Sequence, residues 1–169
     1  MRTKNVRVLP YDSDWKSDFE DIKLELVDIL GNIPISIEHV GSTSVEGLAA
    51  KPIIDIDVVV KPDDVGKAIE FLEGHCYIHE GNLGIEGREA FAYEDKNHLQ
   101  EHHLYVCPSD SKELGRHIAF RDYLMNHPEA VEKYSKVKLE AARLFPESIE
   151  KYIDFKSPVI EEIYKEIGL

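Results

Sequence analysis

The stretch IIDIDVVV, residues 53–60, decides the expected fold. Its β-branched residues predict a strand, and the side chains of a strand alternate between two faces. Asp55 and Asp57 therefore share one face, roughly 6.6 Å apart along the chain, while the isoleucines around them face a core. Two carboxylates on one face of a buried strand repel each other unless a cation lies between them. The pattern is typical of a Mg²⁺ site, because this ion takes one or two carboxylates together with water and substrate phosphates.

The segment just upstream supplies groups for a phosphate. Gly41 lets the backbone approach a ligand closely, and its amide can donate to phosphate oxygens together with the hydroxyls of Ser42 and Thr43. The spacing matches neither the P-loop nor the dinucleotide-binding pattern. Lys51 either neutralises a phosphate or pairs with a nearby aspartate. We therefore expect a phosphate site beside the two aspartates.

Working outward, the periodicity predicts strands between helices and then a helical second half. Expected strands cover 33–40, 53–60, 76–80, 88–94 and 101–107. Expected helices cover 15–30, 62–73 and most of the chain from 109. In this last part, Asp110 and Glu113 resemble a capping box, and new helices should begin at Pro128 and Pro146. Pro158 should kink or break the last helix.

The amino-acid composition limits the classes of binding partner that we expect. The 169 residues include 33 acidic and 20 basic side chains, which gives a net charge of −13. We therefore expect no long nucleic acid and no anionic membrane as partner, because both are bound through basic patches. No apolar run approaches the roughly 18 residues of a membrane span. The start of the chain lacks a signal peptide, and Cys76 and Cys107 have no metal-binding spacing, so we expect a cytoplasmic location.

The segment IEHVGSTSVEGLAAKPIIDIDV, residues 37–58, resembles the signature of the bacterial GrpB-like family. Further similar blocks are VLPYDSDW (8–15), GIEGREAF (84–91), HHLYV (102–106) and FRDYLMNHP (120–128). The family has been placed in the nucleotidyltransferase superfamily, whose pattern is a Gly-Ser turn followed by a D-x-D strand. The resemblance implies an α+β fold, with a mixed β-sheet, flanking helices and a C-terminal helical extension. We expect one domain over 1–169, with a nucleotidyltransferase-like core at 1–108 and the extension at 109–169.

Members of this superfamily usually carry a third carboxylate on a neighbouring strand. In EHHLYVC, alternation gives one face to Glu101, His103 and Tyr105. Glu101 is the candidate carboxylate, and His103 is a candidate metal ligand, phosphate contact or general base. Tyr105 stands where the family pattern has a second histidine. The triad is incomplete as far as the sequence shows, so loss of catalysis stays open.

Two further sets of residues, the histidines and two arginines, allow more than one functional interpretation. His39, His98, His102 and His103 would make a zinc site if they converged, although their spacing fits no established motif. Either Glu38 or His39 should face the cleft. Arg88 and Arg121 carry guanidinium groups that suit phosphate oxygens, but a salt bridge is the favoured role of Arg121, which precedes Asp122.

The leading functional hypothesis is Mg²⁺-dependent nucleotidyl transfer from a nucleoside triphosphate to an unknown acceptor. Asp55 and Asp57 would hold the ions, and His103 or Glu101 would complete the site or take the acceptor's proton. Phosphate contacts would come from the set Gly41, Ser42, Thr43, Lys51 and Arg88. The alternative is a non-catalytic nucleotide-binding or sensing module of the same fold. The sequence leaves the nucleotide, the acceptor and the presence of enzyme activity undecided.

Overall fold

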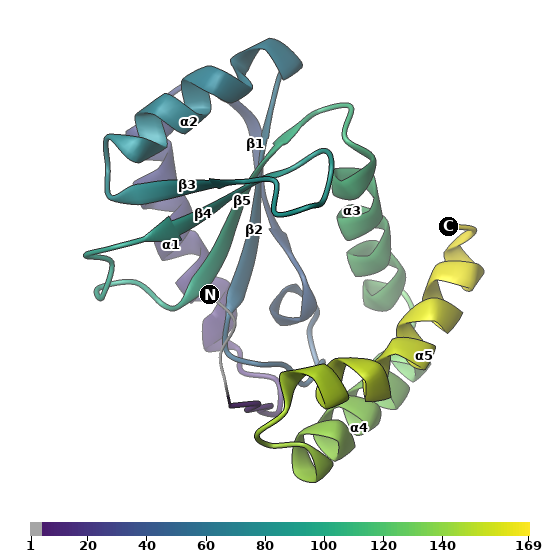
Figure 1. The fold of residues 1–169 in the computed structure, drawn as a ribbon. Coiled ribbons are helices and arrows are strands. Elements are labelled where there is room, and N and C mark those ends of the chain that lie inside the picture. Colours follow the sequence, from purple (N-terminus) through teal and green to yellow (C-terminus); the bar gives the residue numbers. More distant parts are fainter. Residues whose placement is uncertain (1–4) are drawn as a thin grey trace.

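The computed structural model describes residues 5–169 and has a five-stranded mixed sheet at its centre (Figure 1). The strands lie in the order β1-β2-β5-β4-β3. Only the central pair, β2 and β5, runs parallel, and the other neighbouring pairs are antiparallel. The strand bounds are β1 Pro34–Val40, β2 Ile54–Val60, β3 Tyr77–Gly81, β4 Glu89–Tyr93 and β5 His102–Pro108.

Five α-helices surround the sheet. Their bounds are α1 Asp14–Leu30, α2 Val65–Glu73, α3 Lys112–Met125, α4 Pro128–Leu144 and α5 Ile149–Ile167. Helices α1 and α2 cover one side of the sheet, and α3, α4 and α5 form a curved wall on the other side (Figure 1). This arrangement gives the α+β fold that the sequence predicts, including the helical second half.

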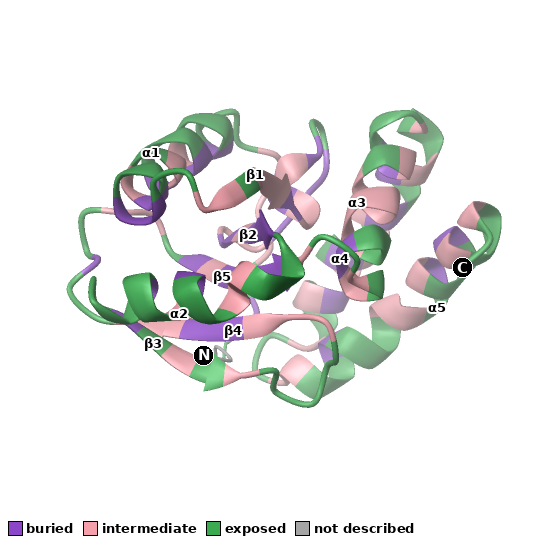
Figure 2. Ribbon diagram, turned by 90° about the horizontal axis from the view of Figure 1, so that it is seen from above, coloured by how far each residue is buried: buried purple, intermediate pink, exposed green. Residues whose placement is uncertain are grey.

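The main core lies between the sheet and helices α1 and α2. It takes Ile54, Ile56 and Val58 of β2, all of them fully buried, together with the apolar stripe of α1. Figure 2 shows buried residues on the central strands and exposed residues on the outer surfaces of these two helices. A second apolar cluster joins Val45 and Leu48, between β1 and β2, to helices α3, α4 and α5. A smaller cluster of Val59, Cys107 and Leu114 packs α3 against β2 and β5, on the side of the sheet opposite the main core.

The predicted elements agree with the structure except at some ends. Ser111, not Asp110, is the cap of α3, and its hydroxyl accepts a hydrogen bond from the amide of Leu114. Helix α5 begins at Ile149 rather than near Pro146. The helix continues through Pro158 without a break, and Figure 1 shows its axis bending along its length. A proline removes one helical hydrogen bond, which bends a helix that packing holds on both sides.

A search of residues 5–169 finds no helix that is both long and apolar enough to cross a membrane.

Candidate functional site

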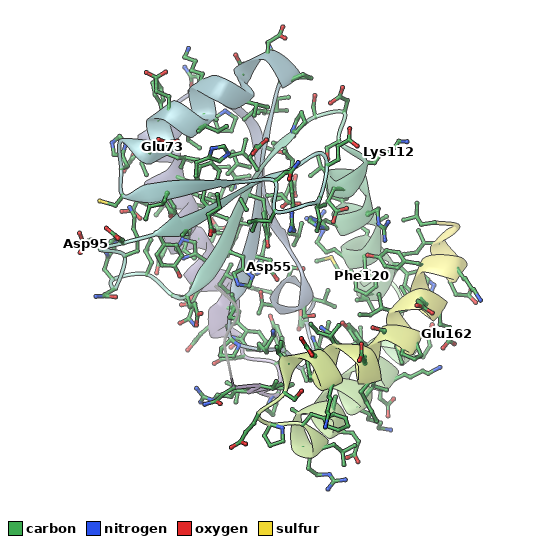
Figure 3. The ribbon with its side chains drawn as sticks, viewed as in Figure 1. Asp55, Glu73, Asp95, Lys112, Phe120 and Glu162 are labelled. Carbon is green, nitrogen blue, oxygen red and sulfur yellow. The ribbon has the colours of Figure 1, made fainter. Side chains whose placement is uncertain are left out.

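Strand β2 presents both aspartates on the side of the sheet that faces the α3–α5 wall. Asp55 is paired in register with His103 of β5, and Asp57 is paired with Tyr105. Because the isoleucines of β2 are buried in the main core, the two aspartates point the other way. Figure 3 labels Asp55 near the centre of the molecule, on the side where α3 carries Phe120.

The turn after β1 fits closely around Asp55. Gly41 has φ +72°, and a Cβ atom built on it would lie 2.2 Å from Oδ2 of Asp55. Only glycine is compatible with this contact, since no other residue avoids both the steric overlap and the strained backbone. A short 3₁₀ turn, Ser42–Ser44, follows. The sequence-predicted Gly-Ser turn and the D-x-D strand therefore do come together.

The hydroxyls of Ser42 and Thr43 in this turn point in different directions. The Oγ atom of Ser42 lies 2.6 Å from Nζ of Lys138, which donates to it from α4. Thr43 is buried, and its Oγ1 atom is hydrogen-bonded to Nε2 of His39 at 2.8 Å. Ser42 thus presents its hydroxyl on the α4 side of the turn, whereas Thr43 can reach a ligand there only through its backbone amide.

Each aspartate has a histidine partner. Nδ1 of His103 lies 3.0 Å from Oδ1 of Asp55, and both side chains are about one-third exposed. Asp57 is fully buried, and its Oδ2 atom accepts from Nδ1 of His117 at 2.7 Å. Its Oδ1 atom is buried and has no hydrogen-bond partner among residues 5–169.

His117 bridges two carboxylates. Its Nε2 atom lies 3.0 Å from Oε1 of Glu113, one turn earlier in α3. Burial lowers the pKa of His117, but the hydrogen bonds and charges of Asp57 and Glu113 outweigh this and raise the pKa above its ordinary value. The ring then donates from both nitrogens, as an imidazolium does between two ionised acceptors.

Three lysines converge on Asp55. Lys51 precedes β2, Lys138 comes from α4 and Lys156 from α5; burial lowers the pKa of each, and the charge of Asp55 opposes this shift in all three. Burial is the stronger of the two effects. It brings the pKa of Lys156 to about 8 and that of Lys138 well below its ordinary value. A protein with net charge −13 therefore holds a cluster of amines around one carboxylate.

Tyrosines line the lysine cluster. The Nζ atom of Lys138 lies 4.7 Å from the centre of the Tyr134 ring, and that of Lys156 lies 4.9 Å from the Tyr152 ring. We expect packing tyrosines with hydroxyls near the surface at 134 and 152 from sequence alone. Both side chains are buried and pack in apolar clusters, as predicted, but the hydroxyl of Tyr152 is buried too and has no hydrogen-bond partner within the described part of the chain.

The remaining predicted residues lie around this centre. Glu101 is exposed and precedes β5; burial lowers the pKa of Lys51, and the charges of Asp55 and then Glu101 oppose this shift. The guanidinium of Arg88 lies 4.4 Å from the centre of the Tyr105 ring. Its Nε atom is buried without a hydrogen-bond partner among residues 5–169.

Arg121 forms ion pairs, as the favoured interpretation predicts. It contacts Glu38 at 2.9 Å and Asp122 at 3.0 Å. Glu38 is paired in register with Asp57 and shares its face, whereas His39 stacks on Phe19 of α1 at 4.7 Å. The open choice between Glu38 and His39 is thereby resolved in favour of Glu38.

The histidines expected in the zinc alternative do not converge. His98 contacts Glu25 of α1, and His102 is buried in contact with Tyr77 on the core side of the sheet. Burial lowers the pKa of His39 to about 4, against the opposing charge of Asp55. Among residues 5–169, no group of three or more His, Cys, Asp or Glu side chains is placed to hold a metal ion by itself. A zinc site built from these histidines is therefore wrong.

Two cavities open beside the aspartates. A cavity of about 190 Å³ is lined by Asp55, Gly41, His117 and Phe120, among others. A larger one of about 500 Å³ lies between the β3–β4 loop and the start of α5, with His103 in its wall. Arg88 and Tyr105 line both cavities.

Sequence reasoning missed His117, Glu113 and the roles of Lys138 and Lys156. One local signal existed, because Glu113 and His117 are spaced i, i+4 on a predicted helix and so share a face. Nothing local indicates that this face meets β2. The two lysines lie on helices whose placement depends on packing far along the chain.

The fold is similar to the nucleotidyltransferase fold of Cid1. The structure of Cid1 in complex with its short product ApU aligns with a TM-score of 0.55 at 11% identity, over 79% of this chain and 42% of that one. At this identity the similarity shows the fold alone.

The GrpB protein family model matches residues 5–166, and the chain belongs to that family. The crystal structure of the conserved protein GrpB from Enterococcus faecalis is 32% identical with a TM-score of 0.80, and covers 96% of this chain and 100% of that one. The UPF0157 protein YqkA of Bacillus subtilis is 33% identical over 159 residues, which are 94% of this chain. The chain spans about half the length of YqkA, 46%. The resemblance found at residues 37–58 is thereby confirmed.

Proposed function

We propose that the cleft between β2 and helices α3–α5, around Asp55, binds a nucleoside triphosphate with Mg²⁺. We further propose that the protein transfers a nucleotidyl group to a small-molecule acceptor. One observation carries this proposal: the glycine turn lies against Asp55 of the D-x-D strand, Lys138 donates to Ser42 of that turn, and the charge of Asp55 also acts on Lys51 and Lys156. The nucleotidyltransferase-like fold supports the same proposal.

The donor set suits a magnesium ion. The buried Oδ1 atom of Asp57 has no hydrogen-bond partner within residues 5–169, and Asp55 is about one-third exposed. A cation between them would satisfy this oxygen and offset the repulsion of the two carboxylates. Two carboxylates with water and substrate phosphates are a usual magnesium environment. When bound, the ion would neutralise charge on the phosphates during transfer.

The phosphates belong beside the lysine cluster. Ser42 and the amide of Gly41 can donate to phosphate oxygens, and Lys138 and Lys156 approach from the helices. A phosphate would supply the negative charge that these buried amines lack, and so favour their protonated forms. Lys51, the third lysine of the cluster, also lines the larger cavity.

His103 is the better candidate for the acceptor's proton. It contacts Asp55, which orients its ring, and it lines the larger cavity. Glu101, the other candidate, lies ahead of β5 and acts on Lys51. General-base removal typically costs roughly 10²–10⁴-fold in rate.

The non-catalytic alternative rests on a specific observation. Of the two strands beside β2, β5 carries His103 and Tyr105 opposite the aspartates and offers no third carboxylate there. The other, β1, carries Glu38 opposite Asp57, but this carboxylate is already ion-paired with Arg121. A binding or sensing module would retain the phosphate contacts and lack turnover.

An assay for pyrophosphate release distinguishes nucleotidyl transfer from binding without turnover. It uses the four labelled nucleoside triphosphates, with cell extract as the acceptor source. Nucleotidyl transfer predicts release by the wild type and a fall of about 10²–10⁴-fold in His103→Ala. His98→Ala, at an exposed histidine paired with Glu25, is the matched control and should keep the wild-type rate. Binding of Mg²⁺-nucleotide without release under any condition would contradict transfer and support the alternative.

A further inference from the structure

The larger cavity has a charged end and an apolar end. Its volume of about 500 Å³ lies in the range of roughly 300–1,000 Å³ that is usual for small-molecule sites. The charged end carries Lys51, Arg88 and His103, and adjoins the Asp55 contact. Glu80 is the acidic residue in the lining, and it is exposed.

The apolar end comes from separate parts of the chain. The lining residues that supply it are Ile53, Leu83, Ile85, Ile149 and Ile153. Leu83 on the β3–β4 loop is 59% exposed and Ile153 on α5 is 37% exposed, although both line the cavity. An apolar ligand body would remove this surface from water, which favours binding.

Arg88 has an unused donor at the charged end. Its guanidinium stacks on the Tyr105 ring at 4.4 Å, which fixes its plane, and its buried Nε atom has no hydrogen-bond partner within residues 5–169. Buried polar atoms of native proteins are nearly always hydrogen-bonded. A carboxylate or phosphate matches a guanidinium group best, through two parallel hydrogen bonds.

We propose that the larger cavity is the acceptor site, and that the acceptor is a small molecule with an anionic group and an apolar body. The assignment of the cavity to the acceptor rests on the proposed function, because the phosphates of the nucleotide are assigned to the lysine cluster. The anionic group lies against Arg88 and Lys51, and the apolar body covers Leu83 and Ile153. The reacting group of the acceptor then lies toward His103 and Asp55.

Calorimetry with three naphthalene probes tests the ligand class without nucleotide or metal. The probes are 2-naphthoate, 2-naphthyl phosphate and the uncharged 2-naphthamide. We expect at least one anion to bind at least tenfold more tightly than the amide, and the tighter of the two anions indicates whether the acceptor carries a carboxylate or a phosphate. Equal binding of all three probes, or no binding of either anion, overturns the proposal.

Two pairs of variants locate the binding. Arg88→Met should remove the preference for the anions, whereas Arg143→Met, at an arginine on α4 that pairs with Glu140, should keep it. Ile153→Glu should weaken anion binding at least tenfold relative to Ile153→Gln, since only the first variant adds a negative charge to the cavity. Unchanged anion binding in both Arg88→Met and Ile153→Glu would place the probe elsewhere and overturn the proposal.

A titration of Mg²⁺-nucleotide into the probe-saturated protein separates this inference from the proposed function. Binding of both ligands together supports the acceptor site. Displacement of the probe by the nucleotide would overturn the acceptor site while supporting nucleotide binding. Anion binding with no nucleotide binding at all would contradict the proposed function and still support the ligand class of the cavity.

Discussion

Asp55 is contacted by groups from four separate segments of the chain. Gly41 lies against its Oδ2 atom, His103 against Oδ1, and the charges of Lys138 and Lys156 act on it from two helices. The sequence predicts the first contact, because the Gly-Ser turn and the D-x-D strand are close in the chain. It leaves the other contacts undetermined, because they depend on how distant elements pack.

Gly41→Ala should damage the site more than the fold. The substitution strains the backbone, since φ is +72°, and drives a methyl group into Asp55. We expect a loss of about 1–2 kcal/mol in the free energy of unfolding from the backbone strain, plus a further loss from the steric clash. Nucleotide affinity should fall at least tenfold.

Gly81→Ala is the matched control for this prediction. Gly81 has φ +74°, but nothing lies within 4 Å of an added Cβ atom. It should therefore show the backbone cost alone and keep nucleotide affinity. Chemical denaturation and calorimetry of the two variants provide the comparison, and equal affinity losses would contradict the role given to the Gly41–Asp55 contact.

Lys156 should make stability depend on pH. Burial lowers its pKa to about 8, while an unfolded lysine has a pKa near 10.4. Between these values the unfolded chain binds more protons, so this lysine makes the free energy of unfolding rise with pH, by at most about 1.4 kcal/mol per pH unit. Below pH 8 the lysine is charged in both the folded and the unfolded state, so the free-energy cost of burying its charge no longer changes with pH.

The stabilisation that Lys156→Met gives relative to wild type should therefore be largest at pH 7 and shrink by pH 10. Urea denaturation of both proteins at several pH values measures this difference. Lys165→Met, at an exposed lysine on the same helix, should show no such trend. A difference for Lys156→Met that stays constant with pH would refute the prediction.

At the scale of elements, β2 connects the core to the site. Its alternating pattern predicts that isoleucines pack under α1 and α2 while the aspartates face the other way, and the structure agrees. The pattern is visible in sequence because the period of a strand is short and local. The approach of α3 to Asp57 is not visible, because helix packing is decided by side chains far apart in the chain.

His117 should be the main polar connection between α3 and β2. His117→Leu leaves Asp57 buried without its ion-pair partner, and we expect a loss of about 3 kcal/mol in the free energy of unfolding. Glu113→Gln removes only the outer, partly exposed carboxylate and should cost less than about 1 kcal/mol. Chemical denaturation measures both, and equal losses would show that His117 is not coupled to Asp57 through its buried pair.

At the scale of the whole molecule, the charge is unevenly distributed. The chain carries −13 overall, yet three lysines and Arg88 gather around the cleft. This contrast favours a small anionic ligand over a long polyanion, because the surface beyond the cleft would repel further phosphates. The fold and the aspartate face are predictable from sequence, whereas the helices that complete the cleft are placed by tertiary packing alone.

A 30-nucleotide poly(U) strand should therefore bind much more weakly than free Mg²⁺-UTP, by at least tenfold at physiological salt. Fluorescence anisotropy of a labelled strand measures its affinity, and competition by unlabelled UTP measures the affinity for the free nucleotide. An affinity for the strand that exceeds that for UTP and falls steeply with salt would contradict the small-molecule assignment.

Calorimetric titration of Mg²⁺-nucleoside triphosphates into the wild type and Asp55→Asn tests the central claim most directly. The amide keeps the shape of the side chain but removes the charge that holds the ion. The account predicts Mg²⁺-dependent binding of at least one triphosphate by the wild type, a loss of that binding in the variant, and a variant that stays folded without ligand. Affinity that is equal in the two proteins, or independent of Mg²⁺, would contradict the claim that the β2 aspartates hold a metal-bound nucleotide.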